Sequence, residues 1–158
     1  MLPHWRTWRT HIQTAIRRAW TLPVVALIII GPWFIWSPFH MYDDVWRWSS
    51  GQGEHGYQIW GWGASNYALA FGWVNHRFEY WPFIIPGALI CIPLLLLLLR
   101  RQIRYNSLGG MLYGYGLFIF IFFYLSRFMQ PNYLGYILDI FVLAYFIDEK
   151  TAPGMSTE

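Results

Sequence analysis

The stretch PFIIPGALICIPLLLLLLRRQIR, residues Pro82 to Arg104, decides the fold. Its first part, Pro82 to Leu99, carries no charge. As a helix this part would be about 27 Å long, which is close to the hydrocarbon thickness of a bilayer. Arg100, Arg101 and Arg104 follow directly. Because cations that flank an apolar span concentrate on the cytoplasmic side, the stretch predicts a transmembrane helix whose carboxyl end faces the cytoplasm.

The overall composition also indicates a membrane protein. Of the 158 residues, 56% are hydrophobic, 22% are aromatic and only 12% are charged. This balance is typical of a polytopic membrane protein whose Trp and Tyr side chains gather at the interfaces. We attribute the net charge of +3 to cytoplasmic loops, and no sequence motif predicts binding to nucleic acid. Cys91 is the single cysteine, so the sequence predicts neither a disulfide framework nor a thiolate metal site.

Three further apolar runs complete a predicted all-α membrane domain over residues 20–150. We expect about four transmembrane helices plus one interfacial or re-entrant helix, with both termini in the cytoplasm and the protein in the inner (plasma) membrane as a multi-pass chain. The predicted spans are 20–36, 82–99, 107–125 and 133–147, and residues 37–81 form an external loop with a short interfacial helix around Tyr42–Trp48.

The two ends of the chain are predicted to lie outside this domain. Residues 1–19 carry four arginines and no acid. They are interpreted either as an amphipathic helix on the cytoplasmic surface or, as we favour, as a basic flank that sets the topology. Residues 151–158 are expected to form a flexible tail.

Residues Gln58 to Val74 allow two topologies. The segment carries no charge but is diluted by glycine and polar residues. If it spans the membrane, the arginines after Leu99 lie outside; if it lies in or dips into the outer interface, they lie inside. The second arrangement places eight of the eleven Lys and Arg residues in the cytoplasm, and we therefore predict that 58–74 is not a span.

A G-x-x-x-G pair lies in the third predicted span. Gly110 and Gly114 would share one helix face and would let a neighbouring helix approach closely. We interpret the pair as a packing feature within the bundle.

Acidic residues are the first candidates for chemistry. Asp43 and Asp44 are adjacent in the predicted external loop, where paired carboxylates could act as a catalytic base or bind a divalent metal. A solvated or helix-capping pair is the favoured interpretation. Asp139 lies about 10 Å into the last predicted span and is expected to be buried. A structural ion pair with Arg127 or a hydrogen bond to a tyrosine is favoured there over a proton relay.

The five histidines lie outside the predicted spans, which argues against a bis-histidine haem site. His40 and His76 could ligate a pigment near the outer interface, but we favour polar anchoring. No cofactor or metal is predicted, although a bound lipid is compatible with the aromatic content.

Four segments of the chain are PFHMYDDVWRWSSG, GWGASNYALAFGWV, YWPFIIPGALICIPLLLLLLRRQ and FYLSRFMQPNYLGYILDIFVLAYFIDE. Together they resemble the C-terminal membrane region of bacterial polytopic glycosyltransferases of the GT-C type, related to lipid-phosphate-sugar mannosyltransferases. The resemblance implies that the turn SRFMQPNYLGY faces the external side, where a lipid-linked donor and an acceptor meet. Arg47, Arg127, Asn132 and Tyr133 are accordingly candidate lipid- or substrate-binding residues.

The resemblance does not transfer a catalytic acid. GT-C enzymes carry that acid in their first external loop, whereas the part matched here is C-terminal, so Asp43 and Asp44 would belong to a later loop. Our main hypothesis is a non-catalytic integral membrane subunit that packs against larger membrane partners and lipids. The alternatives are part of a glycosyltransferase acting on lipid-linked sugars, and an accessory subunit of an energy-converting complex that binds pigment, quinone or lipid.

Overall fold

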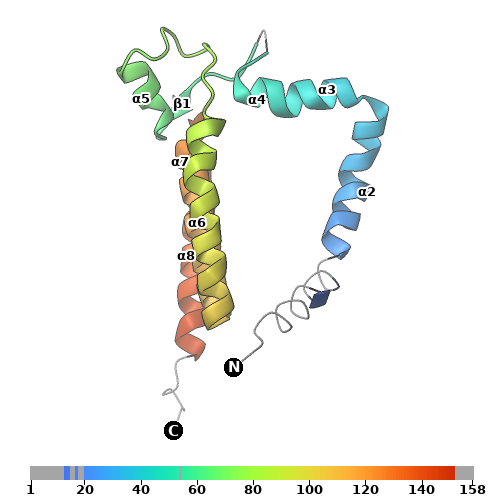
Figure 1. The fold of residues 1–158 in the computed structure, drawn as a ribbon, viewed down its shortest axis with the longest axis vertical. Coiled ribbons are helices and arrows are strands. Elements are labelled where there is room, and N and C mark those ends of the chain that lie inside the picture. The colour runs from blue at the N-terminus through green and yellow to red at the C-terminus, as the bar shows by residue number, and fades with distance from the viewer. Residues whose placement is uncertain (1–12, 15–16, 18–19, 54, 152–158) are drawn as a thin grey trace, which may run out of the picture. The chain divides into compact units, whose positions relative to one another are not determined.

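A computed structural model describes residues 13, 14, 17, 20–53 and 55–151, with only the backbone described for 148–151. Most of the predicted amphipathic segment 1–19 and the tail after residue 151 therefore lie outside the described residues. The described chain is mostly helical and forms two units, Met1–Trp46 and Arg47–Glu158 (Figure 1).

The first unit contains helix α2, Thr21–Trp36, followed by α3, Pro38–Tyr42. The chain continues without a break through a π-helical segment, Asp43–Arg47, into α4, Trp48–Ser50. A helix is therefore present around residues 42–48, as predicted, and it is longer than expected. At Ser37 the helix axis turns by 117°. Pro38 allows this turn because it can begin a new helix but cannot donate the hydrogen bond that would continue the old one.

Helix α6, Ile84–Tyr105, begins two residues inside the predicted span 82–99 and continues beyond it through all three arginines. Its 22 residues correspond to about 33 Å. Asn106 ends the helix in the left-handed conformation with φ of 42°, a role that Asn fills more readily than most residues. The Ser107 side chain then caps α7, Leu108–Leu125, by accepting a hydrogen bond from the Gly110 amide at 3.0 Å. This two-residue connection makes α6 and α7 antiparallel neighbours.

Helix α8, Pro131–Thr151, packs along α7. Gly116 of α7 lies close to α8, since an added Cβ there would lie 3.0 Å from the Phe141 ring and 3.2 Å from Ile140. The predicted glycine pair packs differently, since a Cβ at Gly114 would meet Leu98 of α6 at 3.6 Å. The glycine that α8 requires is thus Gly116, outside the predicted G-x-x-x-G motif.

Two described helices, α6 and α7, are long and apolar enough to cross a membrane, and α2 with its bent continuation could make a third. The predicted count of four spans is not confirmed. The apolar part of α8, Pro131–Ile147, falls below the length of these two helices, because its 17 residues reach only about 25 Å.

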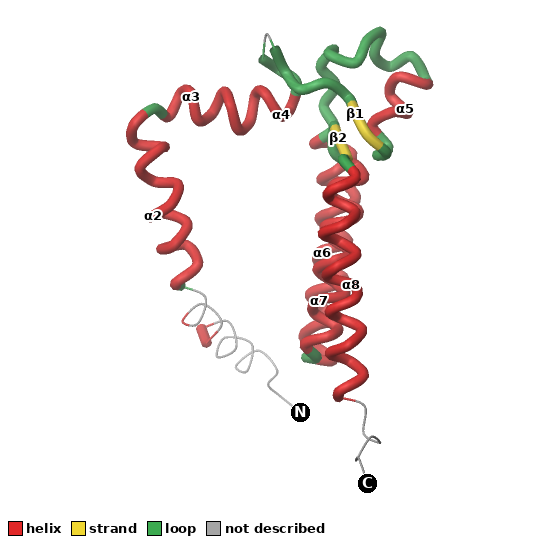
Figure 2. The backbone as a smooth tube through the Cα atoms, turned by 180° about the vertical axis from the view of Figure 1, so that it is seen from behind, coloured by secondary structure: helices red, strands yellow, loops and turns green. Residues whose placement is uncertain are grey.

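Residues 51–83, called here the loop module, lie at one end of the α6–α8 bundle, next to the turn between α7 and α8 (Figures 1 and 2). Strand β1, Trp60–Gly61, pairs in parallel with β2, Phe128–Met129, in that turn. Helix α5, Ser65–Ala70, follows, and Ile59, Ala68 and Val74 form a small core. The prediction that 58–74 is not a span is confirmed, since its only helix has six residues.

Candidate functional site

Arg127 is the centre of the contacts between the loop module and the turn. Its side chain is 3% exposed. The Nε atom donates to the main-chain carbonyl of Tyr57 at 2.5 Å, and Nη2 donates to the carbonyls of Arg77 and Glu79 at 3.1 and 3.0 Å. One planar guanidinium therefore joins the turn to two segments, at Tyr57 and at Arg77–Glu79, that are 48 to 70 residues distant in sequence.

Gly51 makes room for this guanidinium. It ends α4 with φ of +80°, in the left-handed region where glycine is favoured. A Cβ at this position would overlap the guanidinium, coming within 2.6 Å of both Nε and Nη1 of Arg127. The glycine therefore serves two purposes, because it permits both the chain reversal and the burial of Arg127.

The positive charge of Arg127 is balanced by dipoles, since the acceptors of its three hydrogen bonds described above are all main-chain carbonyls. Burial lowers the pKa of Arg127 below its usual value, but an arginine starts so high that it stays charged at any physiological pH. The Nη1 atom is buried and makes no hydrogen bond within the described part of the chain. The arrangement suits a structural clamp, because little of the guanidinium is accessible to a ligand.

Aromatic rings continue from the guanidinium toward α8. Trp48 packs on Tyr57, which packs on Phe128, with ring centroids 4.8 and 4.6 Å apart. Tyr133 lies 6.3 Å from Phe128 and stacks on Phe123 at 4.3 Å. These contacts connect the end of α4 with the facing ends of α7 and α8, and they surround the clamp with apolar surface.

Within the loop module, Asn75 and Glu79 make a second polar contact. The Glu79 carboxylate accepts from the Asn75 amide at 2.6 Å and from its side chain at 3.2 Å. The main-chain hydrogen bond lowers the pKa of Glu79 below its ordinary 4.5, because it stabilises the charged form. This turn presents the Arg77 and Glu79 carbonyls that Arg127 reaches.

The structure separates the predicted candidate residues. Arg127 is buried in the clamp, and Tyr133 lies near it in the aromatic cluster. Asn132 is exposed at the start of α8. Asp43 and Asp44 lie in the π-helical segment of the first unit, with Asp44 exposed and Asp43 half-buried.

Arg47 belongs to the second unit and ends the π-helical segment. Its carbonyl accepts hydrogen bonds from the Gln52 amide at 2.9 Å and from the Ser50 hydroxyl at 3.1 Å. Its main chain therefore helps to form the entry into the loop module. Among the described residues, no group of three or more His, Cys, Asp or Glu side chains could hold a metal ion.

The structure differs from the interpretation of Asp139 in two respects. Its side chain is exposed on α8, whereas the sequence predicted a buried polar residue. The expected ion pair is absent among the described residues, because the Arg127 side chain is directed toward the loop module, where Nε and Nη2 donate to its carbonyls. The depth of Asp139 along the helix was foreseeable, but the side of the helix covered by α7 was not.

Sequence reasoning also missed Tyr57, whose carbonyl accepts from Arg127 and whose hydroxyl accepts from Gln130 Nε2 at 2.6 Å. A main-chain acceptor has no side-chain signature, so only the glycines on either side of it marked the region.

Comparison of the chain with protein-family models, with curated proteins and with solved structures finds no match.

Proposed function

We propose that the protein is a non-catalytic integral membrane subunit whose helix α8 packs against a transmembrane helix of a larger membrane partner. The observation that carries this proposal is the exposed carboxylate of Asp139 near the middle of the apolar part of α8. A charged side chain at the centre of a membrane helix costs about 2.5–3.5 kcal/mol. A partner that offers a cation or a hydrogen-bond donor at that depth would offset this cost.

The position of Asp139 on the helix supports a docking face. Ile137, Ile140 and Ala144 are buried and mark the side of α8 that is covered in the chain. On the opposite side, at spacings of four, three and four, lie exposed residues: Gly135, Asp139, Val142 and Phe146. A Cβ added at Gly135 would meet nothing within 4 Å, so a neighbouring helix could come close beside the carboxylate.

Cross-linking from this face tests the proposal. A photoreactive residue at Val142 should give a product with a second, larger membrane protein, and the same residue at Leu89, an exposed position on α6, should not. Asp139→Leu should lower the yield at least about tenfold, equivalent to about 1.4 kcal/mol. Since Leu is better tolerated in lipid than Asp, this variant should still insert.

Three results would contradict the proposal. These are no product from Val142, a product that joins only two copies of this chain, and a yield that does not depend on Asp139. The two alternative functions, in glycosyl transfer and in energy conversion, stay predictions.

We further propose four spans in the plasma membrane, with the arginine-rich end of α6 and both termini in the cytoplasm. This proposal is supported by the packing of α8 along α7 and by the arginines at the end of α6 opposite to the loop module (Figure 1).

Single-cysteine labelling tests this orientation. In a Cys91→Ser background, cysteine placed at Gln52 should react with a membrane-impermeant maleimide added to intact cells. Cysteine placed at Arg104 should react only after the membrane is permeabilised. The reverse pattern would show that the orientation is inverted, and labelling of both sites in intact cells would exclude a span between them.

A further inference from the structure

A groove between α6 and α7 lies at the end of the bundle opposite to the loop module. It has a volume of about 520 Å³, within the range of roughly 300–1,000 Å³ that is typical of small-ligand sites. Along α6 it extends from Leu95 to Tyr105, a distance of about 15 Å at the helical rise. The groove is thus long and narrow, and it runs parallel to the helices.

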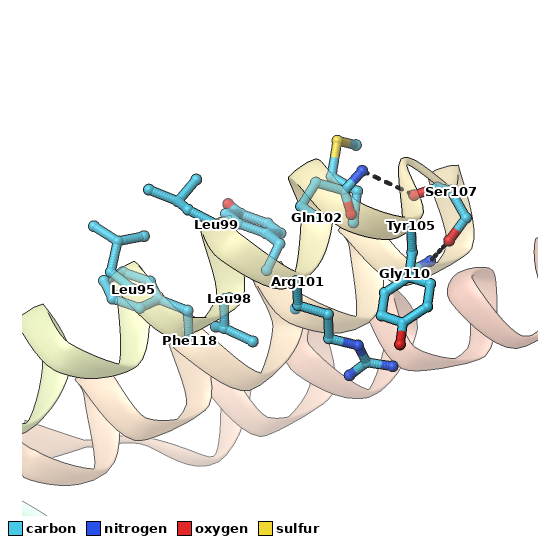
Figure 3. Close-up of a pocket in the computed structure, with 12 residues that line it drawn as sticks. Leu95, Leu98, Leu99, Arg101, Gln102, Tyr105, Ser107, Gly110 and Phe118 are labelled. Carbon is cyan, nitrogen blue, oxygen red and sulfur yellow. Dashed lines mark hydrogen bonds between the residues drawn. The ribbon is translucent and has the colours of Figure 1, made fainter. Parts of the chain in front are cut away.

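The two ends of the groove differ in chemistry. Figure 3 shows Leu95, Leu98 and Phe118 toward one end and Arg101 and Tyr105 toward the other. The leucines belong to the uncharged run that ends at Leu99, whereas Arg101 lies beyond it. In a bilayer the apolar end would therefore face the acyl chains, and the arginine would lie among the headgroups.

The polar groups at the mouth are not equally available. Gln102 donates to the Ser107 carbonyl at 3.0 Å, and the Ser107 hydroxyl accepts from the Gly110 amide at 3.0 Å, so both side chains are already engaged in the turn. Arg101 is exposed and makes no hydrogen bond or ion pair within the described residues. Its guanidinium is the cation at the mouth that can bind a ligand.

Glycine creates the α7 wall of the groove. Gly110 and Gly114 both line it, and a Cβ at Gly114 would only touch Leu98 at the ordinary distance of 3.6 Å. A small addition at Gly114 is therefore tolerated, but a longer side chain would have to enter the space of the groove. The predicted G-x-x-x-G pair thus leaves a cavity beside α6.

We infer that this groove binds one anionic phospholipid, with an acyl chain between α6 and α7 and the headgroup phosphate on Arg101. Charge complementarity selects this occupant, because the mouth presents the cation of Arg101, while the remaining lining is mostly leucine, aromatic and glycine. The inference is independent of the docking face on α8 and goes beyond the proposed function.

Native mass spectrometry of the detergent-purified full chain tests the inference, with dioleoyl phosphatidylglycerol and dioleoyl phosphatidylcholine titrated separately. We expect one retained phosphatidylglycerol per chain and weaker retention of phosphatidylcholine, which carries no net charge. Arg101→Gln should weaken phosphatidylglycerol retention roughly fivefold, the effect of one cation at a membrane surface. Gly114→Leu should abolish the retained lipid by filling the groove.

Two matched variants control for unspecific effects. Arg104→Gln removes a neighbouring cation outside the groove lining, and Gly87→Leu adds the same side chain at a position of α6 where a Cβ meets nothing within 4 Å. Both should bind phosphatidylglycerol like the wild type. Equal retention by all variants, equal retention of both lipids, or no retained lipid would overturn the inference. Since Arg101 is exposed, its variant stays informative even if Gly114→Leu fails to fold.

Discussion

Replacing Arg127 with Met is expected to release the loop module from the end of the helical bundle. The substitution would keep most of the side-chain volume but remove the donors to the carbonyls of Tyr57, Arg77 and Glu79. A buried acceptor left without its partner costs about 1–3 kcal/mol. Three such losses, partly offset because a charge is no longer buried, predict a net destabilisation of roughly 3 kcal/mol.

Amide hydrogen exchange measures this effect locally. The amides of Trp62 and Ala64 donate to the carbonyls of Met129 and Tyr124 at 3.0 and 2.7 Å, so they report attachment of the module. A loss of 3 kcal/mol should accelerate their exchange by about 100-fold, whereas amides in the middle of α7 should keep their protection.

Two further arginine variants separate geometry from charge. Arg127→Lys retains the cation but not the planar fork, so it should recover little of the protection. Arg77→Met removes an exposed cation whose guanidinium carbon lies 5.2 Å above the Trp60 ring, and it should cost less than about 1 kcal/mol. If Arg127→Met exchanged no faster than Arg77→Met, the guanidinium would not be the clamp.

The helices were predictable because the signals that define them are local. The uncharged runs 82–99 and 107–125 placed α6 and α7 correctly, although α6 continues to Tyr105. Their physical basis, apolar transfer, depends on the residues of each run itself. The extension through the arginines was missed because long basic side chains can continue a helix into the headgroup region.

The candidate site was much less predictable. Arg127 was recognised as a candidate for binding, but its partners are main-chain carbonyls at least 48 residues away. Any residue offers such a carbonyl, so the sequence does not mark them. Similar reasoning applies to Asp139, since helical periodicity fixes which residues share a face but not which face a neighbouring helix covers.

The second large effect is expected from Gly61→Ala. Gly61 has φ of +92° and pairs with Met129 across the two parallel strands. An added Cβ would overlap the Met129 carbonyl oxygen and lie 2.6 Å from its carbon. Since both atoms belong to the main chain, no side-chain rotation can relieve the clash, and the strands must separate.

Gly72→Ala provides a control with the same backbone preference but open surroundings. Gly72 has φ of +69°, and a Cβ there would meet nothing within 4 Å. Its substitution should cost only the conformational penalty of about 1–2 kcal/mol, whereas Gly61→Ala adds a main-chain clash and should cost more than about 3 kcal/mol. In hydrogen exchange the Trp62 amide should therefore become at least about tenfold faster in Gly61→Ala than in Gly72→Ala. Equal exchange in the two variants would mean that the β1–β2 contact is loose enough to admit a methyl group, and the loop module would then be held by Arg127 without help from the strands.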